Sequence, residues 1–274
     1  MFRSYYRPHL ALTEYVENVW MMGHEFSLGD PISPIYTYMP THTRFLCFYL
    51  EDQVKVKKGN GVFEERAKSI IIGPQLTPVT LDLGKKHADV IVVLKPCGLY
   101  RLLGIPQREI VDCDFDAGLI LGKDISYVTE QLMNTRCNEK RNDIIQSYLL
   151  RKLINLKPAL PFDRAMLQLV NVQGNLSMDF LASQSCLSVR QMERQSLERI
   201  GLSPKYFARM VRFSEAYKCK ERNPYTSWID ISARFGYYDQ MHLIRDFRHF
   251  TGYTPSFITT DQILGSVKFN SLEP

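Results

Sequence analysis

An internal repeat in the last third of the chain constrains its fold more than any other feature. Residues in two stretches match at an offset of 51, in the pairs Met192/Leu243, Arg194/Arg245, Gly201/Gly252, Ser203/Thr254, Pro204/Pro255 and Tyr206/Phe257. Just upstream the offset is 50, in the pairs Leu181/Ile231, Ala182/Ser232, Cys186/Gly236 and Leu187/Tyr237. One extra residue therefore stands within the second copy, between Leu187/Tyr237 and Met192/Leu243. A repeat of this length predicts one supersecondary unit that occurs twice.

Each copy has the pattern of a helix-turn-helix. A short apolar helix carries a small residue, a tight turn follows, and Ser188 or Asp239 caps a second helix of about three turns. In a helix-turn-helix the second helix enters the major groove with its N-terminal residues on base edges. Arginine can recognise guanine and glutamine can recognise adenine, so the outward positions suit this task. We expect DNA contacts from Arg190, Gln191 and Arg194 in the first copy and from Gln240, Met241 and Arg245 in the second.

A longer helix is expected between the copies, from Ser203-Pro204 to about Arg222. Its apolar face consists of Tyr206, Phe207, Met210, Phe213 and Tyr217. Such a helix would hold the two reading helices about one DNA turn, roughly 34 Å, apart. Residues 162–258 also carry 10 Arg and 3 Lys against 9 acidic residues, most of the net charge of +5 of the whole chain. This excess favours nucleic-acid binding, and a solvated helical surface is the alternative.

Two segments, LSVRQMERQSLERIGLSPKYFARMVRFSEA and IDISARFGYYDQMHLIRDFRHFTGYTPSFI, resemble the DNA-binding domain of the AraC/XylS family of bacterial transcription regulators. The resemblance implies a seven-helix domain with two helix-turn-helix units over residues 162–260, with the family's DNA contacts at the six positions given above. Arg212 and Ala216 match its linker helix. Two residues depart from the pattern, because Ser196 stands where the second copy has Phe247 and Cys186 occupies a turn position that is often Gly.

The first part of the chain has a different periodicity. Short strands separated by turn signals are expected at 35–39, 44–50, 54–58, 69–72, 79–83 and 89–94, with Gly59-Asn60-Gly61 as a hairpin turn. Helical spacing follows at 124–134 and 139–154, and two prolines then mark a linker. The predicted class is α+β, with a β-barrel-like front domain and flanking helices over 1–155, a linker over 156–161 and an all-α domain over 162–260.

Resemblance also bears on the front domain, since most members of the family carry a cupin-like barrel there. The segment LKPCGLYRLLGIPQREIVDCDFDAGLILGKDISYVTEQL is similar to the N-terminal module of one AraC-type subgroup. A barrel lined by aromatic residues would either enclose an apolar or aromatic effector or simply be a packed core. The candidates are Tyr36, Tyr38, Phe45, Phe48 and Tyr49. The helices at 124–154 either form a homodimer interface or pack on the barrel.

Motifs of catalysis are missing from the sequence. There is no Gly-x-Ser-x-Gly, no phosphate-binding Gly-rich loop, no His-Glu-x-x-His and no His-x-His pair of a metal cupin, so we expect no catalytic residue, metal or cofactor. No apolar run approaches the roughly 18 residues of a membrane helix, and six scattered cysteines are typical of a reducing cytoplasm.

The sequence therefore predicts a cytoplasmic bacterial transcription regulator that binds double-stranded DNA under the control of a small-molecule effector, and that contacts RNA polymerase if it is an activator. The alternative is a cupin-type small-molecule-binding protein or metalloenzyme with a helical interaction module.

Overall fold

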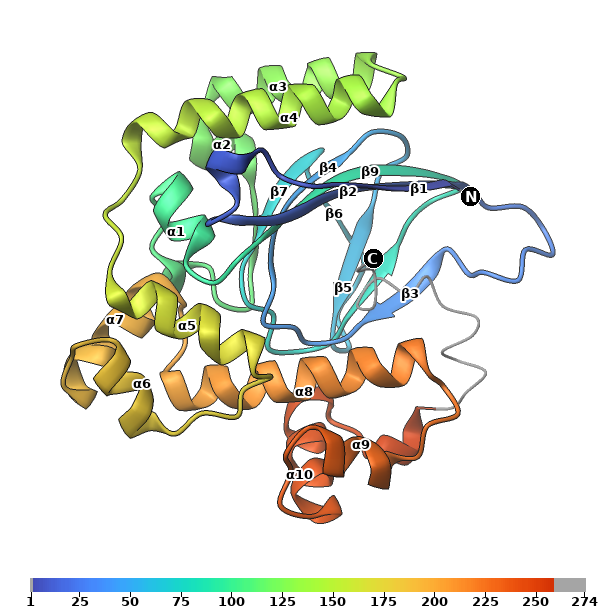
Figure 1. Cartoon of the computed structure of the whole chain (residues 1–274). Coiled ribbons are helices and arrows are strands. Elements are labelled where there is room, and N and C mark those ends of the chain that lie inside the picture. The colour runs from blue at the N-terminus through green and yellow to red at the C-terminus, as the bar shows by residue number, and fades with distance from the viewer. Residues whose placement is uncertain (1, 259–274) are drawn as a thin grey trace.

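The computed structural model describes residues 2–258, which form a strand-rich front part (residues 2–155) and a helical part (residues 156–258) (Figure 1). All the strands lie in the front part. They are β1 (Phe2–Tyr6), β2 (Val16–Glu25), β3 (Ile35–Tyr38), β4 (Arg44–Tyr49), β5 (Lys55–Lys58), β6 (Glu64–Glu65), β7 (Ser69–Ile72), β8 (Val79–Asp82), β9 (Lys86–Leu94) and β10 (Asp114–Asp116).

These strands form two antiparallel sheets rather than one closed barrel. The six-stranded sheet has the order β1-β2-β9-β4-β7-β10, and the four-stranded sheet has the order β3-β8-β5-β6. No ladder joins the two sheets within residues 2–258, so they contact each other through side chains, as in a sandwich. The α+β class is confirmed, and the barrel expectation is corrected to an open two-sheet arrangement.

The six-stranded sheet is buried on both faces. On one face Trp20, Cys47 and Ile91 belong to the apolar cluster between the sheets, together with Val56 and Leu81 of the other sheet. The opposite face packs against four helices, α1 (Gly98–Leu103), α2 (Ala117–Leu121), α3 (Lys123–Asn134) and α4 (Asn138–Lys152). Helices α3 and α4 lie side by side along this sheet (Figure 1). Of the two expectations for residues 124–154, packing on the sheet is therefore what the structure shows.

The helical part begins after a short extended segment. It contains α5 (Pro161–Asn171), α6 (Met178–Gln184), α7 (Val189–Arg199), α8 (Pro204–Arg222), α9 (Trp228–Arg234) and α10 (Gln240–Thr251), followed by a single 3-10 turn (Pro255–Phe257). A seven-helix domain was expected over residues 162–260. Within the described residues this part of the chain consists of six α-helices and this turn, and residues 259 and 260 lie outside the described range. Helix α8 runs beneath the front part and connects the two pairs α6–α7 and α9–α10 (Figure 1).

The front and helical parts share an apolar core. Met39 and Cys97 of the front part are buried in the same cluster as Phe162 of α5, Phe207 of α8 and Phe247 of α10. A polar contact continues this boundary, because the hydroxyls of Thr41 and Ser214 lie 3.2 Å apart. The position of α7 and α8 relative to the sheets is therefore set by a packed boundary.

Candidate nucleic-acid interface

The two predicted helix-turn-helix units have matching local structure. In the first, Cys186 takes a left-handed conformation with φ of 53°, and the Leu187 N–H donates to the Ala182 carbonyl over 3.1 Å. In the second, Gly236 has φ of 70°, and the Tyr237 N–H donates to the Ser232 carbonyl over the same 3.1 Å. Cys186 therefore adopts the backbone for which glycine is the usual residue.

The second helix of each unit is capped as expected. The Ser188 Oγ accepts the Gln191 N–H at the start of α7, and an Asp239 carboxylate oxygen accepts the His242 N–H at 2.6 Å at the start of α10. The extra residue of the second unit is Tyr238, which stands just before this cap with 93% of its surface exposed. Both α7 and α10 thus begin at the residues that the sequence pattern indicates.

All six predicted reading residues lie on the surface. Arg190, Gln191 and Arg194 are exposed on the first two turns of α7, as are Gln240, Met241 and Arg245 on α10. Gln191 has a second role, since its Oε1 accepts hydrogen bonds from the backbone N–H and the hydroxyl of Ser188, both at 3.0 Å. Its carbonyl is therefore part of a capping box, and its amide nitrogen is the group left for a base edge.

One exposed basic residue of α10 is not among the six predicted positions. Arg248 is exposed on α10 three residues after Arg245, and residues three apart lie on the same helix face. This spacing is the signal that could have identified it. A cation at this place, one turn farther from the N-terminus than Arg245, suits a phosphate contact.

Ser196 resolves the departure of the first unit from the family pattern. Its side chain is fully buried, and its Oγ donates to the Leu202 carbonyl over 2.6 Å. In the second unit Phe247 fills the matching place against the rings of Phe213 and Trp228, at centroid distances of 5.5 and 5.2 Å. The first unit thus replaces an aromatic contact with a buried hydrogen bond that ties α7 to the chain before α8.

The five aromatic residues that were predicted to line an effector site do not line a single cavity. Tyr38, Phe45 and Tyr49 line a cavity of about 50 Å³ between the sheets, where burial raises the pKa of Tyr49 although Arg66 opposes this shift. Phe48 points to the opposite face of the six-stranded sheet, because alternate residues of a strand face opposite sides. Tyr36 lies at the boundary with the helical part, where its hydroxyl donates to Glu221 Oε1 over 3.3 Å.

Three histidines of the front part are paired with a carboxylate or buried singly, and the fourth, His9, is exposed. His24 Nε2 lies 2.6 Å from Asp30, and the buried His87 has its Nε2 2.8 Å from Asp89. His42 is buried against the ring of Phe207, and burial lowers its pKa well below the usual value. Within residues 2–258, no three His, Cys, Asp or Glu side chains are grouped as metal ligands would be. Nor is any helix of this range long and apolar enough to cross a membrane.

Comparison with known proteins agrees with this geometry. Residues 181–260 match the family described as "Helix-turn-helix domain", and residues 4–116 match a domain of unknown function, DUF6597. No curated protein matches the chain.

Among solved structures, ToxT from Vibrio cholerae O395 is 13% identical with a TM-score of 0.45, over 92% of this chain and 98% of that one. The same protein bound to (E)-4-(8-methylnaphthalen-1-yl)but-3-enoic acid is 11% identical with a TM-score of 0.48, over 96% and 100%. The AraC-like transcriptional activator CuxR is 15% identical with a TM-score of 0.25, over 75% and 78%.

Paired helix-turn-helix units behind a strand-rich front part define a class of DNA-binding transcription regulators. The match over residues 181–260 supports the helix-turn-helix part of the resemblance seen in the sequence.

Proposed function

We propose that this protein reads double-stranded DNA sequence-specifically through α7 and α10. Arg190, Gln191 and Arg194 would contact one half-site, and Gln240, Met241 and Arg245 the other. The observation that carries the proposal is the exposure of all six side chains at the N-terminal ends of two equivalently capped helices. These are the helix turns that contact base edges in a helix-turn-helix.

Helix α8 supports reading of both half-sites by one chain. Its 19 residues span about 28 Å at the usual rise per residue, which is close to one turn of DNA. Most of its residues are buried, so it cannot bend freely. A single chain can therefore reach two successive major grooves.

Selection of binding sites from a random DNA pool by the full-length chain tests this proposal. We expect two short motifs about one helical turn apart. Arg194→Ala should lose base preference in one motif and Arg245→Ala in the other. Arg164→Ala is the matched control, because Arg164 is an exposed arginine of α5, outside both reading helices. No enrichment by the wild type, or equal enrichment by all variants, would show that these helices do not read DNA.

We further propose that a small-molecule effector controls this activity. The effector was predicted to lie inside the barrel, which corresponds to the space between the two sheets. The cavity there has a volume of about 50 Å³, well below the roughly 300–1,000 Å³ of ligand pockets. A hollow of about 640 Å³ lies instead between β3 and β8 of the front part and α8 of the helical part. Tyr36, Tyr217 and Tyr253 line it together with several hydroxyl-bearing residues, so a neutral aromatic effector suits it best.

Thermal unfolding with a library of neutral aromatic compounds tests the effector proposal. A ligand of the folded state raises the melting temperature. Tyr253→Ala should abolish that shift, whereas Tyr225→Ala, an exposed tyrosine that does not line the hollow, should preserve it. A library without a single stabilising compound, or a shift that both variants retain, would count against this site.

We also propose two domains, a cytoplasmic location, a homodimer and a contact with RNA polymerase. The division into domains 1–155 and 162–260 agrees with the start of α5 at Pro161. A cytoplasmic location agrees with the free thiols of all six cysteines. A homodimer and a contact with RNA polymerase are proposed from the family resemblance alone.

A further inference from the structure

The two reading helices are held in different ways. Helix α10 is fixed from inside the helical part, where Arg209 of α8 lies 2.7 Å from Asp246 of α10. Helix α7 is fixed at its C-terminal end by the front part. The Tyr100 hydroxyl of α1 donates to Glu198 Oε1 over 2.6 Å, and Arg44 Nη2 of β4 donates to the Ile200 carbonyl over 2.5 Å.

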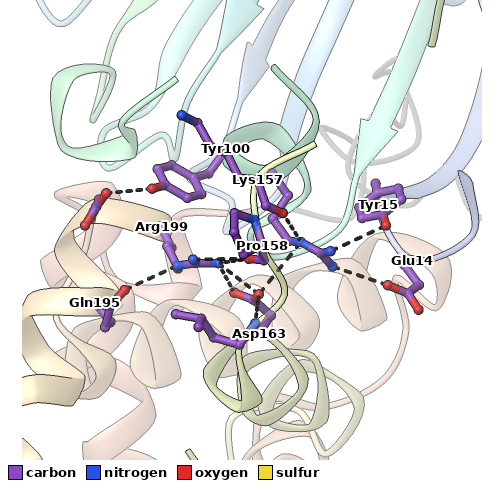
Figure 2. A network of polar contacts seen from close by, with 11 residues as sticks. Glu14, Tyr15, Tyr100, Lys157, Pro158, Asp163, Gln195 and Arg199 are labelled. Carbon is purple, nitrogen blue, oxygen red and sulfur yellow. Dashed lines mark hydrogen bonds and ion pairs between the residues drawn. The ribbon is translucent and has the colours of Figure 1, made fainter. Parts of the chain in front are cut away.

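A buried network of charges extends this contact (Figure 2). Arg199 at the end of α7 donates from Nη1 to both carboxylate oxygens of Asp163, each at 2.9 Å. Arg101 of α1 approaches the same carboxylate to 3.8 Å and also donates to the Lys157 carbonyl in the connecting segment. The three side chains are between 6% and 9% exposed. One buried carboxylate thus lies between an arginine of the front part and an arginine of a reading helix.

Packing at this junction limits the movement of α7. The Arg199 guanidinium lies over the Tyr100 ring at 4.9 Å, in a cation–π contact. Gly201, just after α7, has φ of 87° and approaches the Gln107 backbone so closely that a Cβ there would lie 2.8 Å from the Gln107 carbonyl oxygen. Arg44 is buried, and burial lowers its pKa to about 10, so it stays charged at neutral pH while it donates to the end of α7. The junction therefore fixes both the distance and the orientation of α7 relative to α1.

We propose that Tyr100, Arg101 and Asp163 are positioning residues for DNA reading by α7, so that the front part sets the affinity for the first half-site alone. This inference rests on the proposed reading function of α7 and deepens it. Base recognition tolerates displacements of only about 0.5 Å, so a small change at α1 is enough to misplace Arg190 and Arg194. Helix α10 shares apolar packing with the front part, but its ion pair is with Arg209 of α8.

The experiment compares three DNA probes bound by the full-length chain, one with both selected half-sites and two with either half-site scrambled. The Arg194→Ala and Arg245→Ala selections identify which half-site belongs to which helix. Tyr100→Phe removes one hydroxyl and keeps the ring, and Arg101→Gln removes one charge. On probes that retain only the first half-site we expect each variant to bind on the order of tenfold more weakly. On probes that retain only the second we expect less than a twofold change.

Arg209→Gln is the matched control, because it breaks the ion pair of the second unit. It should weaken binding to the second half-site and leave the first unchanged. Melting curves confirm that each variant is folded, and if Arg101→Gln is not, Tyr100→Phe alone decides. A double-mutant cycle of Tyr100→Phe with Glu198→Gln should be non-additive at the first half-site.

Two kinds of failure are distinguishable. A wild-type chain that selects no motif refutes the proposed function. A wild-type chain that selects both motifs, with Tyr100→Phe weakening both half-sites equally or neither, refutes the positioning role while the reading function stands.

Discussion

Replacing Ser196 by alanine tests whether a buried hydrogen bond substitutes for an aromatic contact in the first unit. The Ser196 Oγ is fully buried and lies 2.6 Å from the Leu202 carbonyl oxygen, so Ser196→Ala leaves a buried carbonyl without this donor. Such a loss costs about 1–3 kcal/mol. Alanine returns about 0.5 kcal/mol through its higher helix propensity. We therefore expect a net destabilisation of about 0.5–2.5 kcal/mol.

Urea unfolding followed by circular dichroism measures this change. With a denaturant slope of about 2 kcal/mol per molar, the midpoint should fall by about 0.25–1.25 M at an unchanged slope. Ser183→Ala, an exposed serine of α6, is the control and should shift stability by no more than about 0.5 kcal/mol. Ser196→Phe, which restores the residue type of the second unit, should cost at least about 1–3 kcal/mol because the site is closed. A Ser196→Phe chain as stable as the wild type would refute the reasoning.

Substitutions at three more positions give direct tests. Arg245→Ala should weaken binding to the selected DNA site by about 1–3 kcal/mol and relax the preference at one base pair, measured by titration of single-base site variants; an unchanged preference would exclude Arg245 as a base reader. Cys186→Gly should be neutral or stabilising by up to about 1 kcal/mol, and Cys186→Val destabilising, in melting curves, because Cys186 has φ of 53°; the reverse order would contradict the turn geometry. Phe247→Ala should cost about 3–5 kcal/mol in urea unfolding, since Phe247 is 2% exposed among aromatic rings, and a loss below about 1 kcal/mol would contradict that packing.

The helical part was predictable from the sequence because its signals are local. Capping residues, the turn positions and the spacing of apolar residues all fall within a few positions of each other, and they placed the starts of α7, α8 and α10 correctly. The repeat supplied the same evidence twice. The seventh helix is the exception, since only a 3-10 turn follows α10 in the described range.

Strand β2 shows why part of the front was missed. Its face toward the helices includes Val19 and Met21, and its face toward the other sheet includes Trp20 and Met22. A strand that is buried on both faces loses the alternation of apolar and polar residues by which strands are recognised. β10 was missed for another reason, because two of its three residues are acidic, and the fold supplies the partner of one of them, since Asp114 pairs with Arg66 at 2.8 Å.

The remaining contacts at the junction join residues that are far apart in the sequence. Arg101, Asp163 and Arg199 look like surface charges in the sequence, and only the fold brings them together across 36 and more positions. The same holds for Tyr36, whose partner Glu221 is 185 residues away. Propensity and periodicity describe neighbours in the chain, so they carry no information about such pairs.

The shared core has a consequence for building chimeras of this protein. Met39 and Cys97 fill places in the apolar cluster beneath the first helix-turn-helix unit, although both belong to the strand-rich half of the chain. Domains that recombine freely usually meet at a small, polar boundary. A foreign sensor module grafted ahead of residue 156 would leave cavities in that cluster and an uncovered end of α7, unless it supplied equivalent side chains. The two halves of this regulator must therefore be transplanted, or inherited, as a matched pair.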